Sequence, residues 1–349
     1  MSASSLPENR RGAAPLEARN ARSAYTVDVS KEEPTSSSAM FKIAPRHSTL
    51  FSTAPASRFL LVAVALALGA CNPATREIKP LRESCDDGDL AACNDLADRI
   101  LRGDRVLQDR AYAAVLFQRA CDGNVAQACD RLGQMYEMGT GLNRNGTRAA
   151  GLYEQACDGG EMEGCIHLGS QYQQDDSGVS EDLARAANLF EQACDGGALE
   201  GCIRLGVMNQ RGDGGFQDPI EAASLFERAC EGGLMVGCVQ LGASYVTGEG
   251  VDQDLTRAAS LYQQACDTDE MTGCLNLGDL HVTGQGVALD LDLAVALFQQ
   301  GCDGRHGESC LRVGDLYATG SGVPRNLSRA TSLFRRACFL GHREACGRR

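Results

Sequence analysis

Residues 238–266 read CVQLGASYVTGEGVDQDLTRAASLYQQAC, and this stretch decides the fold. In its first part, Val, Leu and Tyr recur at helical spacing, which predicts an amphipathic helix. Gly248–Gly250 ends that helix, because glycine adopts the left-handed conformation that a helix stop needs. Asp254 is a suitable N-cap for a second helix over 255–266, whose Leu, Ala and Tyr residues form one apolar face. The stretch is therefore predicted to be a helical hairpin.

The same unit recurs along most of the chain. Sixteen of the 17 cysteines form eight Cys-x7-Cys pairs, whose first members lie 36, 36, 37, 36, 36, 36 and 36 residues apart. The pairs are Cys85/Cys93, Cys121/Cys129, Cys157/Cys165, Cys194/Cys202, Cys230/Cys238, Cys266/Cys274, Cys302/Cys310 and Cys338/Cys346. A fixed period of this length is typical of a stacked repeat array. We place the single extra residue near Gln174–Ser180, in a loop between helices.

A glycine recurs in the middle of the first helix of six hairpins, four residues after the second cysteine. It is found at Gly133, Gly169, Gly206, Gly242, Gly278 and Gly314. Glycine in a helix interior costs about 1 kcal/mol relative to alanine. Its recurrence predicts that another backbone passes close at this point. The Ala-Ala-x-Leu-aromatic pattern of the second helices, as in Ala258–Tyr262, predicts the packed core.

Each cysteine pair spans the turn between a second helix and the helix that follows it. The even number of cysteines in the array favours disulfides and an oxidising compartment. A reversal of seven residues can bring two helix ends within the roughly 5.5 Å Cα separation of a disulfide. Closing such a loop contributes about 2–3 kcal/mol. The alternatives are metal binding, for which the spacing is wrong and the histidines scattered, and reduced cysteines that act as small apolar residues.

The segment 59–70 reads FLLVAVALALGA and follows Arg46 and Arg58. A basic stretch, a short apolar run and small residues are typical of a secretory signal. The tetrad Leu68–Cys71 resembles the bacterial lipoprotein box, which implies that Cys71 is lipidated and anchors the protein to a membrane. Asn72, in place of an aspartate, favours the outer membrane, facing the periplasm or the cell surface. The alternative is a plain secretory signal cleaved near Ala70.

These features predict five regions. Residues 1–39 form a disordered extension, ahead of a translation start that we place at Met40. Residues 40–70 form the lipoprotein signal peptide, 71–84 a lipidated tether, 85–346 the repeat array and 347–349 a short tail. The protein is expected to be a monomer.

Composition excludes several kinds of chemistry. The net charge is −13, which argues against nucleic-acid binding. Lys79 is the one lysine beyond Cys71, so the Ser-x-x-Lys and Lys-Thr-Gly motifs of serine β-lactamases cannot form there. His167, His281, His306 and His342 form no cluster in sequence, and we expect no metal, cofactor or catalytic residue.

The recurring pattern L-G-x-x-Y-x-x-G-x-G-V-x-x-D-x-x-R-A-A-x-L-[FY]-x-x-A-C-[DE]-G-G resembles the Sel-1-like repeat family, especially its cysteine-rich secreted bacterial branch. The resemblance covers Cys85–Cys346 and implies an all-α fold. It implies a right-handed α/α solenoid of about seven helical-hairpin repeats, each stapled by a disulfide, that holds proteins or peptides. The departures are local: Asn209 and His281 replace the tyrosine, and Gly212–Phe216 replaces the glycine–valine loop.

The candidate partner-binding surface lies on the first helices, which line the concave side of such solenoids. Two residues after each second cysteine stand Asp95, Arg131, His167, Arg204, Gln240, Asn276 and Arg312. Four residues further on stand Arg99, Met135, Gln171, Met208, Ser244, Leu280 and Leu316, on the same helical face. We propose Arg131, His167, Arg204, Gln240, Asn276 and Arg312 as contacts for an extended peptide or loop.

The sequence therefore predicts an envelope lipoprotein that acts as a protein-interaction scaffold. Some members of the family carry a β-lactamase or penicillin-binding label, so one alternative is an envelope hydrolase of that type. A second alternative is a secreted factor that engages host or neighbouring cells.

Overall fold

The structure is a computed structural model that describes residues 73–348, apart from 105, 175, 176 and 216. Over these residues the chain forms α-helices, one 3-10 helix and no strand, which confirms the predicted all-α class. The helices are α2 (Pro73–Asp86), α3 (Leu90–Arg102), α4 (Arg110–Asp122), α5 (Ala126–Met138), α6 (Gly146–Asp158), α7 (Met162–Tyr172), α8 (Leu183–Asp195), α9 (Leu199–Arg211), α10 (Pro219–Glu231), α11 (Met235–Thr247), α12 (Leu255–Asp267), α13 (Met271–Thr283), α14 (Leu291–Asp303), α15 (Gly307–Thr319), α16 (Leu327–Phe339) and η1 (Arg343–Ala345).

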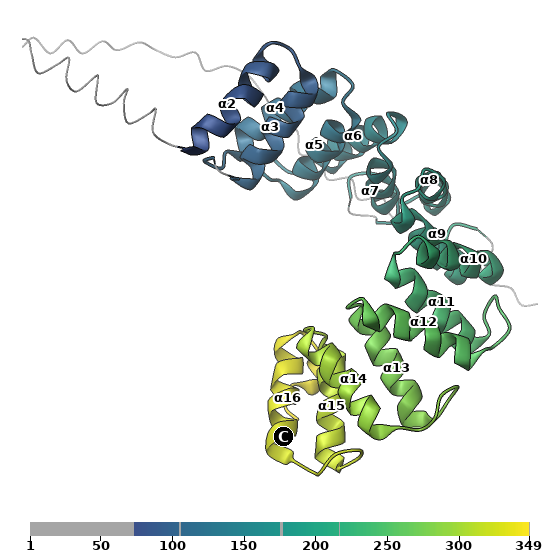
Figure 1. Cartoon of the computed structure of the whole chain (residues 1–349). Coiled ribbons are helices and arrows are strands. Elements are labelled where there is room, and N and C mark those ends of the chain that lie inside the picture. Colours follow the sequence, from purple (N-terminus) through teal and green to yellow (C-terminus); the bar gives the residue numbers. More distant parts are fainter. Residues whose placement is uncertain (1–72, 105, 175–176, 216, 349) are drawn as a thin grey trace, which may run out of the picture. The chain divides into compact units, whose positions relative to one another are not determined.

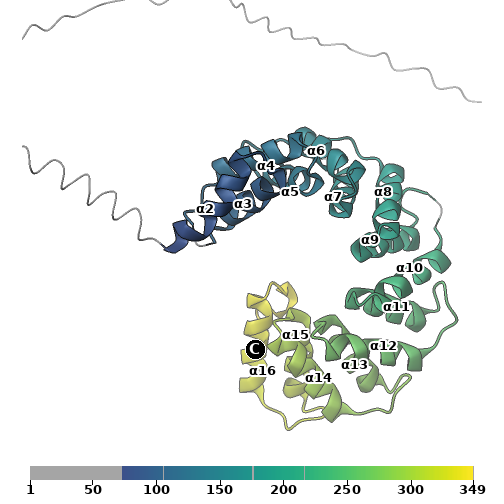
Figure 2. The same cartoon turned by 45° about the horizontal axis from the view of Figure 1, so that its top comes forward.

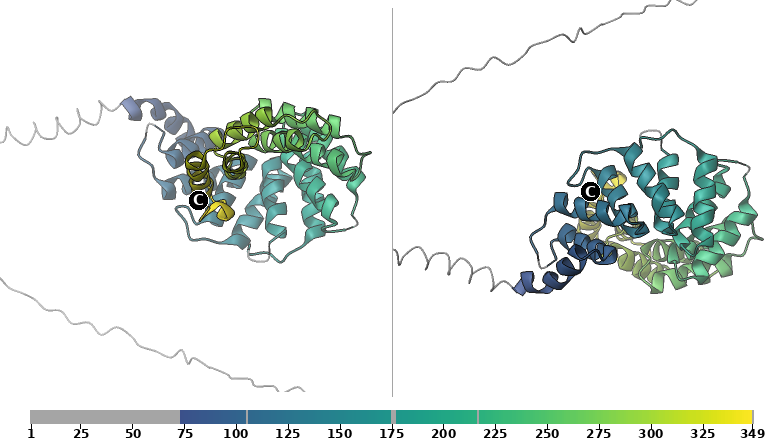
Figure 3. Two further views of the ribbon diagram at one scale, coloured as in Figure 1. Left: turned by 90° about the horizontal axis from the view of Figure 1, so that it is seen from below. Right: turned by 90° about the horizontal axis from the view of Figure 1, so that it is seen from above.

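The helices pair into hairpins that stack in chain order, as expected of an α/α solenoid (Figure 1). From α3 onward, each odd-numbered helix is the first of a hairpin and the even-numbered helix after it is the second. Each helix packs against the one before it and the one after it in the chain, and the views of Figure 3 agree with this order. In Figure 2 the first helices α5, α7, α9 and α11 lie on the inner side of the row, and α6, α8 and α10 on the outer side.

The predicted helix limits of residues 238–266 are confirmed. Gly248 has the left-handed φ of 78° that ends α11, and its N–H bonds to the Ser244 carbonyl. Asp254 accepts a hydrogen bond from the Arg257 N–H at 2.9 Å and so caps α12. An aspartate or asparagine caps the second helix of every hairpin in this way. These residues are Asp109, Asn145, Asp182, Asp218, Asp254, Asp290 and Asn326.

The recurring mid-helix glycine faces an aromatic ring, so the expectation of a passing backbone is wrong. A Cβ built on Gly206 would lie 2.6 Å from Cε1 of Phe226, a ring with no exposed surface. The same ring position opposes the glycine in the other hairpins, as Tyr153 opposes Gly133. The glycine therefore makes room for the ring that fills the core between the two helices of its own hairpin.

Disulfides join the two cysteines of all eight Cys-x7-Cys pairs, as predicted. The bonds are Cys85–Cys93, Cys121–Cys129, Cys157–Cys165, Cys194–Cys202, Cys230–Cys238, Cys266–Cys274, Cys302–Cys310 and Cys338–Cys346. Their Cα atoms lie between 4.5 Å apart, at Cys302–Cys310, and 4.9 Å apart, at Cys338–Cys346. Each disulfide closes the turn that follows a second helix. So many disulfides indicate an extracytoplasmic protein.

The second cysteines are buried core residues as well as disulfide partners, which the sequence analysis did not predict. We had placed each pair only across a turn, but the second cysteine lies in the first turn of a first helix and is at most 2% exposed. This holds for Cys129 of α5, Cys165 of α7, Cys202 of α9, Cys238 of α11 and Cys274 of α13. They are buried because the preceding second helix packs over the start of each first helix. In the sequence analysis, burial as a small apolar residue was the alternative for reduced cysteines. The structure shows that the disulfide-bonded cysteines are buried in the core in the same way.

The single 37-residue step falls where we placed it, between α7 and α8. The loop from 173 to 182 is longer than its counterparts for two reasons: the inserted residue, and the early end of α7 at Tyr172. Helix α7 has 11 residues, whereas α5 and α9 have 13.

Residues 73–84, which the sequence analysis placed in the tether over 71–84, belong to a helix. Helix α2 precedes the first cysteine pair and contains Cys85. Ile78 is buried, and Leu81 packs against the same cluster, because α2 covers the apolar face of α3. Cys71 itself lies outside the described residues.

Arginine–tyrosine contacts join the two helices of four hairpins. The guanidinium of Arg257 lies over the ring of Tyr245 at 5.0 Å, and Arg329 over Tyr317 at 4.4 Å. The other pairs are Arg148 over Tyr136 and Arg185 over Tyr172. In the two hairpins in which Asn209 and His281 replace the tyrosine, the arginine is also replaced, by Glu221 and Leu293. The two positions change together because the contact is a pair.

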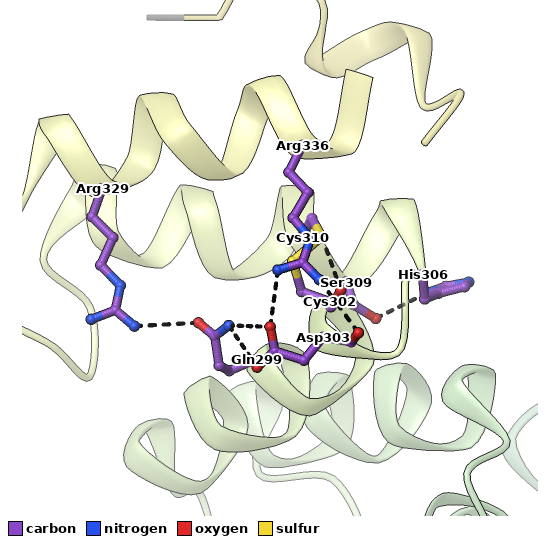
Figure 4. The surroundings of a disulfide bond; sticks show 8 residues. All are labelled: Gln299, Cys302, Asp303, His306, Ser309, Cys310, Arg329 and Arg336. Carbon is purple, nitrogen blue, oxygen red and sulfur yellow. Dashed lines mark hydrogen bonds and ion pairs between the residues drawn. A yellow bond between two sulfur atoms is a disulfide. The ribbon is translucent and has the colours of Figure 1, made fainter. Parts of the chain in front are cut away.

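Hydrogen bonds and ion pairs also connect a second helix to the preceding hairpin, as Figure 4 shows for α16. Arg336 of α16 donates to an Asp303 carboxylate oxygen at 3.0 Å, beside the Cys302–Cys310 disulfide. Arg329 donates to Gln299 at 3.5 Å, and Gln299 in turn donates to Asp303. These groups are well exposed, so each tie contributes at most about 1 kcal/mol.

Candidate functional site

All six proposed contact residues lie on first helices, one on each of α5, α7, α9, α11, α13 and α15. They occupy the same position of successive helices, and each is partly or well exposed. The residues are Arg131, His167, Arg204, Gln240, Asn276 and Arg312. They therefore form a row that crosses the repeats, on helices of which α5, α7, α9 and α11 lie on the inner side in Figure 2.

The second predicted row does not lie at the surface. Met135, Gln171, Met208, Ser244 and Leu280 are at most 5% exposed, so these five offer little surface to a partner. They turn inward because neighbouring hairpins pack closely enough to cover this side of each first helix. Arg99 and Leu316 are partly exposed.

Two arginines of the row pair with the preceding hairpin. Arg131 lies 3.8 Å from the Asp98 carboxylate and Arg312 lies 3.5 Å from that of Asp279. Both carboxylates stand five residues after a second cysteine. Arg348, which our sequence analysis omitted, occupies the same position after Cys346 and lies 2.6 Å from Asp315. The 36-residue offset would have revealed Arg348, since it stands two residues after the last cysteine.

Arg204 differs from these arginines, because its ion-pair partner lies in its own helix, although its guanidinium also contacts an aromatic ring of the preceding hairpin. Its guanidinium pairs with Glu200 of the same helix at 3.0 Å and lies 5.9 Å from the centre of the Phe190 ring. About two-fifths of its side chain remains exposed. A partner could therefore reach this charge without displacing an ion pair between repeats.

His167 belongs to a buried polar network between α5 and α7. Its Nδ1 lies 2.6 Å from Asp130, a carboxylate that is 4% exposed and also accepts from Gln134. Burial of the imidazole lowers the pKa of His167, but the hydrogen bond and the negative charge of Asp130 outweigh it, and the net direction is upward. The Tyr153 ring packs 5.0 Å from the imidazole, and its hydroxyl donates to Glu137 at 2.6 Å. His167 therefore joins two hairpins and also presents one ring edge.

Gln240 and Asn276 form the uncharged part of the row. Asn276 lines an open cleft of about 350 Å³ between α11 and α13, together with Ala243, Asp279 and Leu280. Burial raises the pKa of Asp279, and the nearby Arg312 opposes that rise. Burial also raises the pKa of Tyr262, at the back of the cleft, to about 12, and a hydrogen bond with Asn276 opposes this rise.

Two further observations concern only the part of the chain that the structure describes. None of its helices combines the length and apolar character needed to cross a bilayer. No three His, Cys, Asp or Glu side chains gather there as metal ligands would. The apolar run 59–70 lies outside the described residues.

Hairpins of fixed length, stacked in order and joined by disulfides, define a helical repeat protein. The Sel1 repeat family matches the chain seven times, at residues 90–125, 126–161, 163–197, 199–234, 236–267, 272–306 and 307–342. The chain therefore belongs to the Sel1 repeat family, as the sequence pattern predicted. Proteins of this family generally act as scaffolds for protein–protein interaction.

Solved structures show the same fold. A protective antigen of uropathogenic Escherichia coli with an SLR fold is 25% identical, with a TM-score of 0.67, over 77% of this chain and 57% of that one. A Sel1 repeat protein from Oxalobacter formigenes is 20% identical, with a TM-score of 0.63, over 70% of this chain and 96% of that one. The chain thus matches little more than half the length of the E. coli antigen. No functionally curated protein matches the chain.

Proposed function

We propose that this protein is an envelope lipoprotein that binds a protein partner along the row of first helices. The observation that carries this proposal is the row itself, in which partly exposed polar side chains recur at one position of successive hairpins. A rigid array of such positions suits an extended segment, since each hairpin can contact a few residues of it. The disulfides support an oxidising location.

Capture of partners from the envelope fraction tests the binding surface. The triple variant Arg131→Ala, Arg204→Ala and Arg312→Ala is expected to lose most of the captured partner while its thermal midpoint stays close to that of the wild type. The matched control is Arg119→Ala, Arg228→Ala and Arg336→Ala, which removes three arginines from equivalent positions of second helices. Arg228 and Arg336 also pair with the preceding hairpin, through Asp195 and Asp303. Equal capture by the two triple variants would remove the row from consideration.

The membrane anchor is tested separately. Cys71→Ser is expected to abolish incorporation of labelled palmitate and to release the protein from the membrane fraction, because the proposed lipid is attached to that sulfur. Retention of label in the variant would refute lipidation at Cys71.

A further inference from the structure

An open cleft lies on the row, between α11 and α13. Its walls are apolar at Ala243, Val246 and Leu280, and Thr247 adds a hydroxyl at its edge. Its volume of about 350 Å³ is enough for one long side chain together with a short piece of backbone. The cleft is open to solvent and belongs to first helices that carry two of the proposed contact residues.

Ala243, which lines the cleft, is the smallest side chain at its position in the repeat. The other residues five positions after a second cysteine are Asp98, Gln134, Ser170, Val207, Asp279 and Asp315. Each of these side chains is larger than a methyl group. The array therefore accepts a larger residue at this position, which gives a way to fill the cleft without disturbing the fold.

Asp279 is the charged residue among those that line the cleft, and it belongs to a cluster with more negative than positive groups. Asp279 shares the Arg312 guanidinium with Glu308, at 3.5 Å and 3.4 Å respectively. Two carboxylates thus face one cation, whereas in the next hairpin Asp315 has Arg348 at 2.6 Å. Burial raises the pKa of Asp279, Arg312 opposes this rise and Glu308 adds to it. A second cation beside Asp279 would restore the balance.

The neighbouring amides suit the backbone of a peptide. Gln240 and Asn276 occupy the same position on α11 and α13, and both are partly exposed. A carboxamide both donates and accepts, so it can pair with the N–H and C=O groups of an extended chain. Aliphatic walls that end at a carboxylate match the stem and the charged head of a lysine or arginine side chain.

We propose that the cleft between α11 and α13 receives a lysine or arginine side chain from an extended segment of the partner protein. The overall charge of −13 favours the approach of such a segment. This inference rests on the proposed function and names the chemistry of the partner.

Selection from a random decapeptide library tests the cleft, with the oxidised protein purified from cell envelopes as the target. Enriched peptides are expected to share a lysine or arginine at one position, and replacing it with glutamine should weaken binding about tenfold or more, the usual scale for a charge-assisted hydrogen bond. Asp279→Asn and Ala243→Gln should each weaken binding to the same extent. The matched controls Asp315→Asn and Ala243→Ser should change affinity less than twofold.

Three outcomes would overturn the proposal: no enriched peptide, enriched peptides without a basic residue, or equal losses in Asp279→Asn and Asp315→Asn. Capture from the envelope fraction with the same variants separates this failure from that of the proposed function. A partner that is captured equally well by Asp279→Asn would refute the cleft alone. Absence of any partner captured by the wild type would count against both.

Discussion

Replacing Gly206 with alanine tests how the hairpin core is packed. The added Cβ would lie 2.6 Å from Cε1, 3.0 Å from Cδ1 and 3.1 Å from Cζ of Phe226. Carbon atoms in contact prefer about 3.5–4.0 Å, so the ring or the helix must move by several tenths of an ångström or more. Phe226 is fully buried and has no free space to enter. We expect overpacking to cost about 1–3 kcal/mol, against which the better helix propensity of alanine returns about 0.5–1 kcal/mol.

The expected net loss is therefore about 0–2.5 kcal/mol, confined to the hairpin of α9 and α10. Hydrogen exchange measured on the amides of these helices is the suitable assay, because it reports the local stability of one hairpin within the array. Adding Phe226→Leu to Gly206→Ala should recover part of the loss, since the smaller side chain removes the clash.

Gly151→Ala is the matched control. Gly151 also lies within a helix, α6, but an added Cβ would meet nothing within 4 Å. It should stabilise α6 by about 0.5–1 kcal/mol. If Gly206→Ala stabilised its helix to the same degree, the packing explanation for the recurring glycine would be refuted.

Three further predictions concern one backbone conformation and two side-chain contacts. Arg305 has a φ of 69°, so Arg305→Gly should raise the thermal midpoint by relieving about 1 kcal/mol of backbone strain, and an unchanged or lower midpoint would contradict this. Tyr245→Asn and Arg257→Glu should each lower the midpoint by removing a cation–π contact of about 0.5–1 kcal/mol, and strictly additive losses in the double variant would argue against a pair. The pKa of His167 is raised in the fold, so its stabilising contact with Asp130 is complete below the unfolded value of about 6.5 and is lost as the pH rises through the folded value. His167→Gln should therefore lower the midpoint more at pH 5.5 than at pH 9, and an equal effect at both would refute the role of the charge.

The sequence predicts those parts of the fold that depend on residues within one hairpin. Asp254 and Gly248 mark helix limits by local backbone chemistry, which a single unit of sequence contains. The cysteine period predicted the disulfides because seven intervening residues leave few other partners within reach. The extra residue before α8 was placed correctly because the loop that contains it lies within one hairpin.

The parts that sequence missed depend on how two elements meet. The mid-helix glycines indicated a close approach, but periodicity does not say whether a ring or a backbone fills the space, and the ring of Phe226 was assigned only to the core. The sequence analysis did not predict helix α2, which lacks the repeat pattern, although Ile78 gives it a buried face. Met135 and Met208 were placed at the surface, and Cys238 only at a turn. All three are buried, because neighbouring hairpins pack over them, and the sequence of a single hairpin does not contain this packing.

The candidate site was predicted in part. The recurring position of Arg131, Arg204 and Arg312 was identified from the period, and the structure places all three on first helices. Their carboxylate partners and the cleft beside Asp279 could not be foreseen, because they depend on the offset between hairpins.

The central claim is that eight short disulfide loops hold this repeat array together outside the cytoplasm. The most direct measurement is the intact mass of protein taken from cells and unfolded in an alkylating reagent without reductant, since the second cysteines are buried in the fold. We predict no alkylated array thiol and a mass lower by sixteen hydrogens than that of the reduced array, two for each disulfide. Peptides should link Cys85 to Cys93 and so on through Cys338 to Cys346. Protein in which all sixteen array thiols react with the reagent would contradict the account.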